Sequence, residues 1–133
     1  MGINFKSALG LQEASMRLRS ERASVLSSNL ANMDTPNFKA RDINFQEALN
    51  ERISGTSTRT LNKTQVNHMG FDAGGAGSAE RYYRTPSQPS IDGNTVEENT
   101  EHAEFMKNSL EFQVAFTLLN SKFKGLTKAI KGE

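Results

Sequence analysis

The apolar residues of this chain are concentrated toward its two ends. Residues 105–130 hold ten of the 28 Leu, Ile, Val and Phe residues, whereas the forty residues 51–90 hold only four. The sparse middle is rich in Gly, Ser, Thr and Asn, a mixture typical of loops and flexible insertions. The pattern therefore predicts two structured terminal segments separated by a flexible insertion.

The last third of the chain predicts a long helix from about residue 96 to residue 131. Thr95 and Glu98 have the spacing of a capping box, and lysines cluster near the predicted end. At 1.5 Å per residue such a helix is roughly 50 Å long. One apolar stripe has heptad spacing (Phe105, Ser109, Phe112, Phe116, Leu119, Phe123, Leu126 and Ile130). A second stripe lies on nearly the opposite side (Ala103, Leu110, Val114 and Leu118), so two partners are needed to cover this helix.

The first third predicts another two-sided helix, from about residue 5 to residue 32. It ends before Asp34-Thr35-Pro36, because the residue ahead of a proline is disfavoured in the helical region. A turn follows in which Asn37 can take a positive φ. We then expect a short extended passage, a short helix at about 45–53, and a second extended passage around Tyr82 and Tyr83.

These elements predict a mainly α fold in which the two long terminal helices pair as an antiparallel, coiled-coil-like hairpin. Residues 1–50 and 91–133 form a discontinuous helical domain, with the turn in loop 33–44, and residues 51–90 form an irregular or small β insertion. Each helix covers one stripe of the other, and a repeated contact through the outer stripes produces a filament or tube. The predicted assembly interface comprises Leu11, Leu18, Val25, Leu30, Phe105, Leu110, Phe112, Val114, Phe116, Leu118, Leu119, Phe123, Leu126 and Ile130.

Composition and motifs argue against most ligand-binding functions. The chain has 16 Lys and Arg against 15 Asp and Glu, so it lacks the excess of positive charge that is typical of nucleic-acid binders. It has no Cys, which excludes disulfides and thiolate metal sites. No apolar run is long enough for membrane insertion. Glu98 and His102 lack a third metal ligand, so a solvated acidic first turn is the preferred interpretation. We predict no catalytic, cofactor or metal residues, and we interpret Asp92-Gly93-Asn94 as a turn.

A recognisable motif lies at the end of the first predicted helix. Residues 28–42, Ser-Asn-Leu-Ala-Asn-Met-Asp-Thr-Pro-Asn-Phe-Lys-Ala-Arg-Asp, resemble the Asn-x-x-Asn-x-x-Thr-Pro-Gly-aromatic signature of the bacterial flagellar rod and hook proteins. Asn37 stands where the family usually has Gly, and Asn is the next most tolerant residue for a positive φ. The motif turn comprises Asn29, Asn32, Asp34, Thr35, Pro36, Asn37 and Phe38.

Three further features resemble the B-type proximal rod proteins of the flagellar basal body, the FlgB family. They are the length, the Asp-Gly-Asn-Thr-Val run at residues 92–96, and the ending from Leu119 onward. The resemblance covers about residues 8–50 and 81–133. It implies a non-enzymatic subunit that self-assembles through its terminal helices into the tubular drive shaft, which transmits torque and contains the export channel.

The resemblance also implies a location and a set of partners. Such proteins are exported without a cleaved signal by the flagellar type III export gate and lie in the periplasmic rod. Their partners are further copies, other rod proteins, the rod-base adaptor protein and the surrounding MS ring, and no nucleic acid or small-molecule substrate is implied. Ile3, Phe5 and Leu9 could form an export signal or could simply pack in the tube.

The alternative is a small helical adaptor or secretion chaperone that binds one partner through an apolar helix face. Such a protein is folded alone, whereas a rod subunit gains helix on assembly, so circular dichroism over a range of concentrations separates the two. An enzyme such as a peptidoglycan hydrolase needs an acid pair in a folded cleft, and no such pair is recognisable here.

Overall fold

The computed structural model describes residues 5–54 and 79–132. They form five elements: α1 (Phe5–Ala31), β1 (Arg41–Ile43), α2 (Phe45–Ser54), β2 (Arg81–Tyr83) and α3 (Glu98–Lys131). The mainly helical fold predicted from the sequence is confirmed, and both long helices agree with the predicted ranges to within two residues. Ile3 lies outside the described residues, Phe5 begins α1, and Leu9 is buried.

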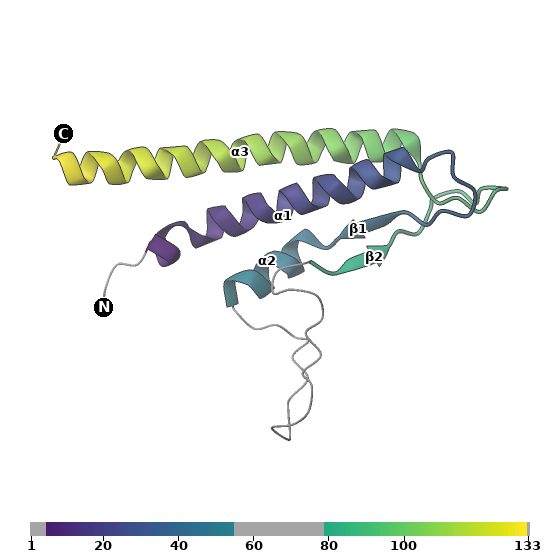
Figure 1. The fold of residues 1–133 in the computed structure, drawn as a ribbon, viewed down its shortest axis with the longest axis horizontal. Helices are drawn as coiled ribbons and strands as arrows, with labels where there is room; N and C mark the ends of the chain where they lie inside the picture. Colours follow the sequence, from purple (N-terminus) through teal and green to yellow (C-terminus); the bar gives the residue numbers. More distant parts are fainter. Residues whose placement is uncertain (1–4, 55–78, 133) are drawn as a thin grey trace, which may run out of the picture.

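Helix α1 lies in the middle of the molecule. Figure 1 shows α3 running antiparallel along one side of α1, while β1, β2 and α2 lie along the other side. The two long helices come together where α1 ends and α3 begins, and they diverge toward their free ends. The predicted hairpin is therefore present, with a small third layer packed on α1.

The apolar core lies between α1 and this third layer. Its buried residues are Leu18, Val25, Ile43, Ala48 and Ala79, with Phe45 and Leu49 packed against them. Leu18 and Val25, which we had assigned to the assembly interface, thus lie in the chain's own core. The periodicity of α1 predicts an apolar stripe but does not distinguish a neighbouring molecule from a returning segment of the same chain.

The third layer includes a two-stranded antiparallel sheet. Strands β1 and β2 pair so that Arg41 lies opposite Tyr83, Asp42 opposite Tyr82, and Ile43 opposite Arg81. Within the predicted insertion, residues 51–54 continue α2 and residues 81–83 form the short strand β2. Residues 55–78 of the insertion lie outside the described residues.

The predicted capping box at the start of α3 is wrong. Glu97 is the N-cap residue and makes no side-chain capping hydrogen bond. The hydroxyl of Thr95 instead accepts a hydrogen bond from the backbone N–H of Ala40 at 2.8 Å. At the other end, Gly132 has a φ of 76° and its N–H donates to the carbonyl of Lys128, a typical glycine C-cap.

Candidate functional site

The face of α3 that packs on α1 is polar in its first half. Glu101, Asn108 and Ala115 lie seven residues apart and are all buried. Glu101 is fully buried, so the prediction of a solvated acidic first turn is wrong for this residue. A carboxylate is stable at such a position only with charged or hydrogen-bonding partners.

Those partners belong to a group of buried and half-buried residues, here called the charge network: Arg22, Asn29, Asp42, Arg84, Glu101 and Glu104. At its centre is Asp42 of β1. Arg22 of α1 donates from Nε to Oδ1 and from Nη2 to Oδ2 of Asp42, both at 2.9 Å. Arg84, just after β2, donates from Nη2 to Oδ2 at 2.7 Å. Burial raises the pKa of Asp42, but the hydrogen bonds from Arg22, the Ile43 amide and Arg84 outweigh burial and leave the pKa below its usual value.

The charge network also ties α3 to the rest of the molecule. Arg84 Nη1 donates to Oε1 of Glu101 at 2.6 Å, and Arg22 Nη2 donates to Oε2 of Glu104 at 2.9 Å. Each arginine therefore binds Asp42 and one glutamate of α3. Hydrogen bonds to Asp42 raise the pKa of Arg22 despite its burial. Both arginines therefore stay charged, and the network joins α1, β1, α3 and the segment after β2.

Asn29, the first residue of the sequence motif, belongs to the charge network. Its Nδ2 donates to the carbonyl of Arg41 at 2.7 Å and to Oε2 of Glu101 at 3.1 Å. Its Oδ1 accepts from the N–H of Arg41 at 3.2 Å. One buried side chain therefore holds the start of β1 against α1 and α3.

The rest of the motif contacts the second recognised segment. We call this contact the motif junction; it joins residues 32–40 to residues 92–96. Asn37 has a φ of 61°, as predicted, and its N–H donates to the carbonyl of Asp92 at 2.9 Å. Gly93 has a φ of 73°, and a Cβ there would lie 2.6 Å from Oδ1 of Asn37. Position 93 therefore favours glycine for its conformation, and a larger residue there would also displace the side chain of Asn37.

Side-chain hydrogen bonds complete the motif junction. Asn94 is buried and donates from Nδ2 to the carbonyls of Asn32 at 3.1 Å and Met33 at 2.6 Å, just beyond the end of α1. The hydroxyl of Thr35 donates to Oδ1 of Asn32 at 3.2 Å. Asp34 and Pro36 are exposed and Phe38 is half-buried. The two motifs recognised separately in the sequence thus form one structural unit.

The opposite side of α3 is an exposed apolar surface, here called the outer face: Met106, Leu110, Val114 and Leu118. Each of these side chains is more than half exposed. In Figure 1 none of the other four elements lies on the side of α3 that points away from α1. The outer face includes three residues of the predicted assembly interface.

The other predicted interface residues differ in burial. Phe105, Phe116, Phe123 and Ile130 of α3 are exposed, as is Leu11 of α1. Half-buried positions are Leu30, Phe112, Leu119 and Leu126.

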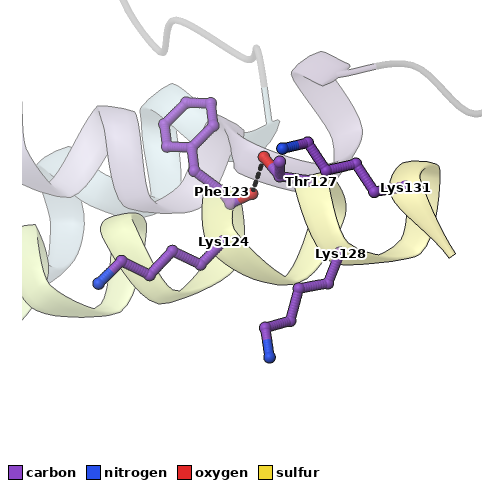
Figure 2. Close-up of a pocket in the computed structure, with 5 residues that line it drawn as sticks. All are labelled: Phe123, Lys124, Thr127, Lys128 and Lys131. Carbon is purple, nitrogen blue, oxygen red and sulfur yellow. Dashed lines mark hydrogen bonds between the residues drawn. The ribbon is translucent and has the colours of Figure 1, made fainter. Parts of the chain in front are cut away.

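A shallow groove of about 380 Å³ lies near the C-terminal end of α3, between Phe123, Lys124, Thr127, Lys128 and Lys131. We call it the lysine groove. Figure 2 shows Phe123 on one side of it and Lys124 and Lys128 on the other. The hydroxyl of Thr127 is held by the carbonyl of Phe123 at 2.9 Å.

The described residues give no support for metal binding or for a membrane span. Within 5–54 and 79–132, no three His, Asp or Glu side chains are placed to hold a metal ion. His102 Nε2 lies 4.0 Å from Glu98 Oε1, and both side chains are largely exposed. No helix in these two ranges is long and apolar enough to cross a bilayer.

Sequence reasoning missed the arginines and Asp42 of the charge network. One signal was available for Arg22, which lies on the same side of α1 as Leu18 and Val25, four residues after the first and three before the second. A charged residue in an apolar stripe indicates a buried partner. The identity of that partner depends on how β1 and α3 are placed, which local spacing does not specify.

Known proteins resemble this chain over nearly its whole length. Residues 12–39, which cover most of α1 and the motif turn, match a family model described as flagella basal body rod protein. The flagellar basal body rod protein FlgB of Aeromonas hydrophila is 46% identical over 134 residues, covering 100% of this chain and 99% of the relative. FlgB of Cereibacter sphaeroides strain ATCC 17029 is 46% identical over 130 residues, covering 97% and 98%. FlgB of Escherichia coli strain K12 is 37% identical over 129 residues, covering 94% of each chain.

Proposed function

This chain belongs to the FlgB family of flagellar basal body rod proteins, and we propose that it builds the proximal rod by packing the outer face of α3 against neighbouring subunits. It is a structural subunit of the rod, and its place is the flagellar basal body. The relatives align with this chain over nearly its full length, and each is named as a basal body rod protein. This favours a rod subunit over a small adaptor or secretion chaperone. The proposed role is mechanical and involves no catalysis.

The outer face is the observation that supports this mode of assembly. Leu110, Val114 and Leu118 repeat every four residues and are more than half exposed, so they form a continuous apolar strip. A strip of this kind on a helix is typical of a protein–protein contact. Phe116, Phe123, Leu126 and Ile130 belong to the other stripe of α3, and a second neighbouring subunit would cover them. Torque would then pass between subunits through packed apolar side chains.

The family resemblance supports the remaining parts of the proposal. Copies of the chain contact other rod proteins, the rod-base adaptor protein and the surrounding MS ring. The chain passes the flagellar type III export gate without a cleaved signal and folds in the periplasmic part of the rod, around the export channel. Ile3, Phe5 and Leu9 remain candidates for the segment that the gate recognises.

The test places a charge on the outer face. A double variant Leu110→Asp and Val114→Asp is expressed in cells that lack their own copy of the gene. We expect loss of swimming in soft agar and loss of the protein from isolated basal bodies, because an unpaired carboxylate is costly to bury in an apolar contact. Both positions are exposed in the subunit, so the helix itself should be retained.

The control is Asn120→Asp, which adds a carboxylate at an exposed position of α3 that lies off the strip of Leu110, Val114 and Leu118. It should swim and be incorporated like the unchanged chain. Normal swimming by the double variant would refute a contact through the outer face. If the unchanged chain neither restores swimming nor enters basal bodies, the proposed function itself is wrong.

A further inference from the structure

Strand β2 forms the outer edge of the two-stranded sheet. Figure 1 shows β1 between α1 and β2, so β2 lies on the side of the sheet away from both long helices. All three residues of β2 are exposed, and Tyr83 is the most exposed tyrosine, at 64%. Among the described residues, no other strand lies beside this edge.

The register shows which backbone groups the edge of β2 presents. Pairs of opposite residues in an antiparallel sheet alternate between those that exchange hydrogen bonds and those whose N–H and C=O groups point outward. The amide of Arg84 donates to the carbonyl of Ala40 at 2.9 Å, which makes these two residues a bonded pair. Two positions before Arg84, Tyr82 is therefore also bonded to β1, while the backbone groups of Arg81 and Tyr83 point away from it.

The two strands differ in what meets their outward backbone groups. On β1, the side chain of Asn29 accepts from the N–H of Arg41 and donates to its carbonyl, so α1 covers that edge. On β2, the N–H and C=O groups of Arg81 and Tyr83 have no hydrogen-bond partner among the described residues. Two donors and two acceptors at alternate residues are the pattern that an added extended segment binds.

The two faces beside this edge carry opposite charge. Successive strand residues point to opposite faces. Arg81 lines a groove of about 280 Å³ together with Arg41, and neither arginine forms an ion pair with another described residue. Tyr82 lines a groove of about 250 Å³ together with three glutamates, Glu47, Glu51 and Glu80. An added segment is therefore favoured when acidic side chains face the arginines and basic side chains face the glutamates.

A second copy of β2 does not match this charge pattern. In an antiparallel pair of identical strands related by a twofold axis, opposite residues share a face. Arg41 and Arg81 of both copies would then meet on one face, and like charges placed opposite one another are destabilising. Charge complementarity therefore favours an occupant from a different protein.

We propose that the free edge of β2 binds an extended segment of another protein in the assembled rod, which adds to the sheet as a third strand. The segment carries Asp or Glu on the face of Arg81 and Lys or Arg on the face of Tyr82, at alternate positions. Main-chain hydrogen bonds to Arg81 and Tyr83 hold it, and the two charged faces select it. This inference rests on the proposed rod function, and it adds a contact on the side of the molecule opposite α3.

A proline at position 83 tests the edge without breaking the sheet. Because the amide of Tyr83 points away from β1, Tyr83→Pro removes a donor to the added segment and no hydrogen bond between the two strands. In cells lacking their own copy of the gene, recovery of this variant in isolated basal bodies should fall at least about fivefold. The matched control Tyr83→Ala also loses the ring but keeps the amide, and its recovery should stay within about twofold of the unchanged chain.

Hydrogen exchange of the unchanged chain tests the same edge without a substitution. In the free chain, the amides of Arg81 and Tyr83 should exchange quickly, and the amide of Tyr82 more slowly because it is bonded to β1. In isolated basal bodies, exchange at Arg81 and Tyr83 should slow at least about tenfold, since a third strand then holds both amides.

Photo-cross-linking identifies the occupant. Benzoylphenylalanine is placed at position 83 of the full-length chain, basal bodies are irradiated, and the linked peptide is sequenced by mass spectrometry. It should come from another protein and carry Asp or Glu within about two positions of the linked residue, because alternate residues share a face. Arg81→Glu repels that carboxylate and should lower recovery in basal bodies about tenfold, whereas Arg81→Lys should stay within about twofold of the unchanged chain.

Three results would overturn the third strand. They are equal recovery of Tyr83→Pro and Tyr83→Ala, unchanged exchange at Arg81 and Tyr83 on assembly, and a cross-link to a second copy of this chain or to a segment without an acidic residue. If purified Tyr83→Pro unfolds at lower urea than Tyr83→Ala, the exchange result decides. Normal incorporation of the unchanged chain would in each case leave the proposed rod function standing, whereas its absence from basal bodies would refute that function first.

Discussion

Asp42 and Glu101 are carboxylates buried in a molecule whose apolar core is small. Asp42 binds the guanidinium groups of Arg22 and Arg84, and Glu101 binds that of Arg84, so the charge network replaces much of the apolar contact expected between α1 and the start of α3. A buried ion pair adds little net stability compared with a well-packed apolar pair, but loss of one partner leaves the other as an uncompensated buried charge. The network therefore enforces one arrangement of the chain more than it strengthens the fold.

Arg84 provides the clearest test of this network. Arg84→Met leaves Glu101 and Asp42 without one charged partner each, and the free energy of unfolding should fall by about 3–5 kcal/mol. Urea unfolding followed by circular dichroism measures the change. The control is Arg41→Met, whose exposed side chain pairs with Tyr83 through a hydrogen bond and a cation–π contact, and which should cost less than about 1 kcal/mol. Equal losses in the two variants would contradict a special role for the network.

Acid should weaken the fold through Asp42. Its pKa in the folded chain is below the unfolded value of about 3.9, so its contribution to stability is complete above that pH. The contribution is lost as the pH falls through the folded pKa. Urea unfolding of the unchanged chain and of Asp42→Asn should show a stability gap at pH 7 that narrows below about pH 4. A gap that stays constant down to pH 2 would show that Asp42 is not the group responsible.

At the scale of elements, the long helices could be predicted from the sequence, but the surfaces through which they pack in the fold could not. Pro36 and the apolar periodicity place the end of α1 to within one residue. By contrast, the hydroxyl of Thr95 accepts a hydrogen bond from the amide of Ala40 and so belongs to the motif junction, while Glu97 takes the N-cap position of α3. The burial of Glu101 depends on Arg84, which follows a three-residue strand with no strong pattern of its own.

In the candidate site too, local features could be predicted from the sequence and tertiary contacts could not. Sequence reasoning identified the turn at Asn37 and the exposed strip from Leu110 to Leu118, because a turn and a helix face are local properties. It placed Leu18 and Val25 at a contact between molecules, because the return of β1 and α2 over α1 depends on the tertiary fold. A helix has the same apolar periodicity in its sequence whether it is buried against a segment of its own chain or against a second chain.

Asn108 is the element-scale position where a substitution should strengthen the hairpin. It is buried; its Nδ2 donates to the carbonyl of Arg19 at 2.9 Å, while its Oδ1 has no partner among the described residues. Asn108→Leu removes that unpaired oxygen together with the hydrogen bond to the Arg19 carbonyl, which lies within α1, so the free energy of unfolding should rise by about 1 kcal/mol at most. Thermal unfolding by circular dichroism tests this, with the exposed Asn120→Leu as a control expected to stay within about 0.5 kcal/mol. A lower melting temperature for Asn108→Leu would refute the expectation.

At the scale of the whole molecule, stability should be unevenly distributed. The charge network, the motif junction and the apolar core all lie where α1 meets β1 and the start of α3. Toward the other end the long helices diverge, and Phe123 and Ile130 are exposed. The free subunit therefore has a tightly packed end and a loosely packed end, and the lysine groove belongs to the latter.

Hydrogen exchange should reveal this asymmetry. In the free chain, amides of residues 18–29 should exchange slowest and those of residues 119–131 fastest, because local opening is easiest where few side chains are buried. In isolated basal bodies, protection of residues 119–131 should rise, since neighbouring subunits then cover them. Uniform protection along α3 in the free chain would contradict the proposed difference between the two ends.

The charge network also has a consequence for the order of folding. Arg22 and Glu104 are 82 residues apart in the chain, and Asn29 and Glu101 are 72 residues apart. Contacts of such long range form late and slow the folding of small proteins, because the intervening chain must first be closed into a loop. The first fifty residues leave the ribosome with Arg22, Asn29 and Asp42 present, but their partners arrive only with the last third of the chain. The charge network therefore cannot form until synthesis of the chain is nearly complete, and the subunit stays without it up to that point.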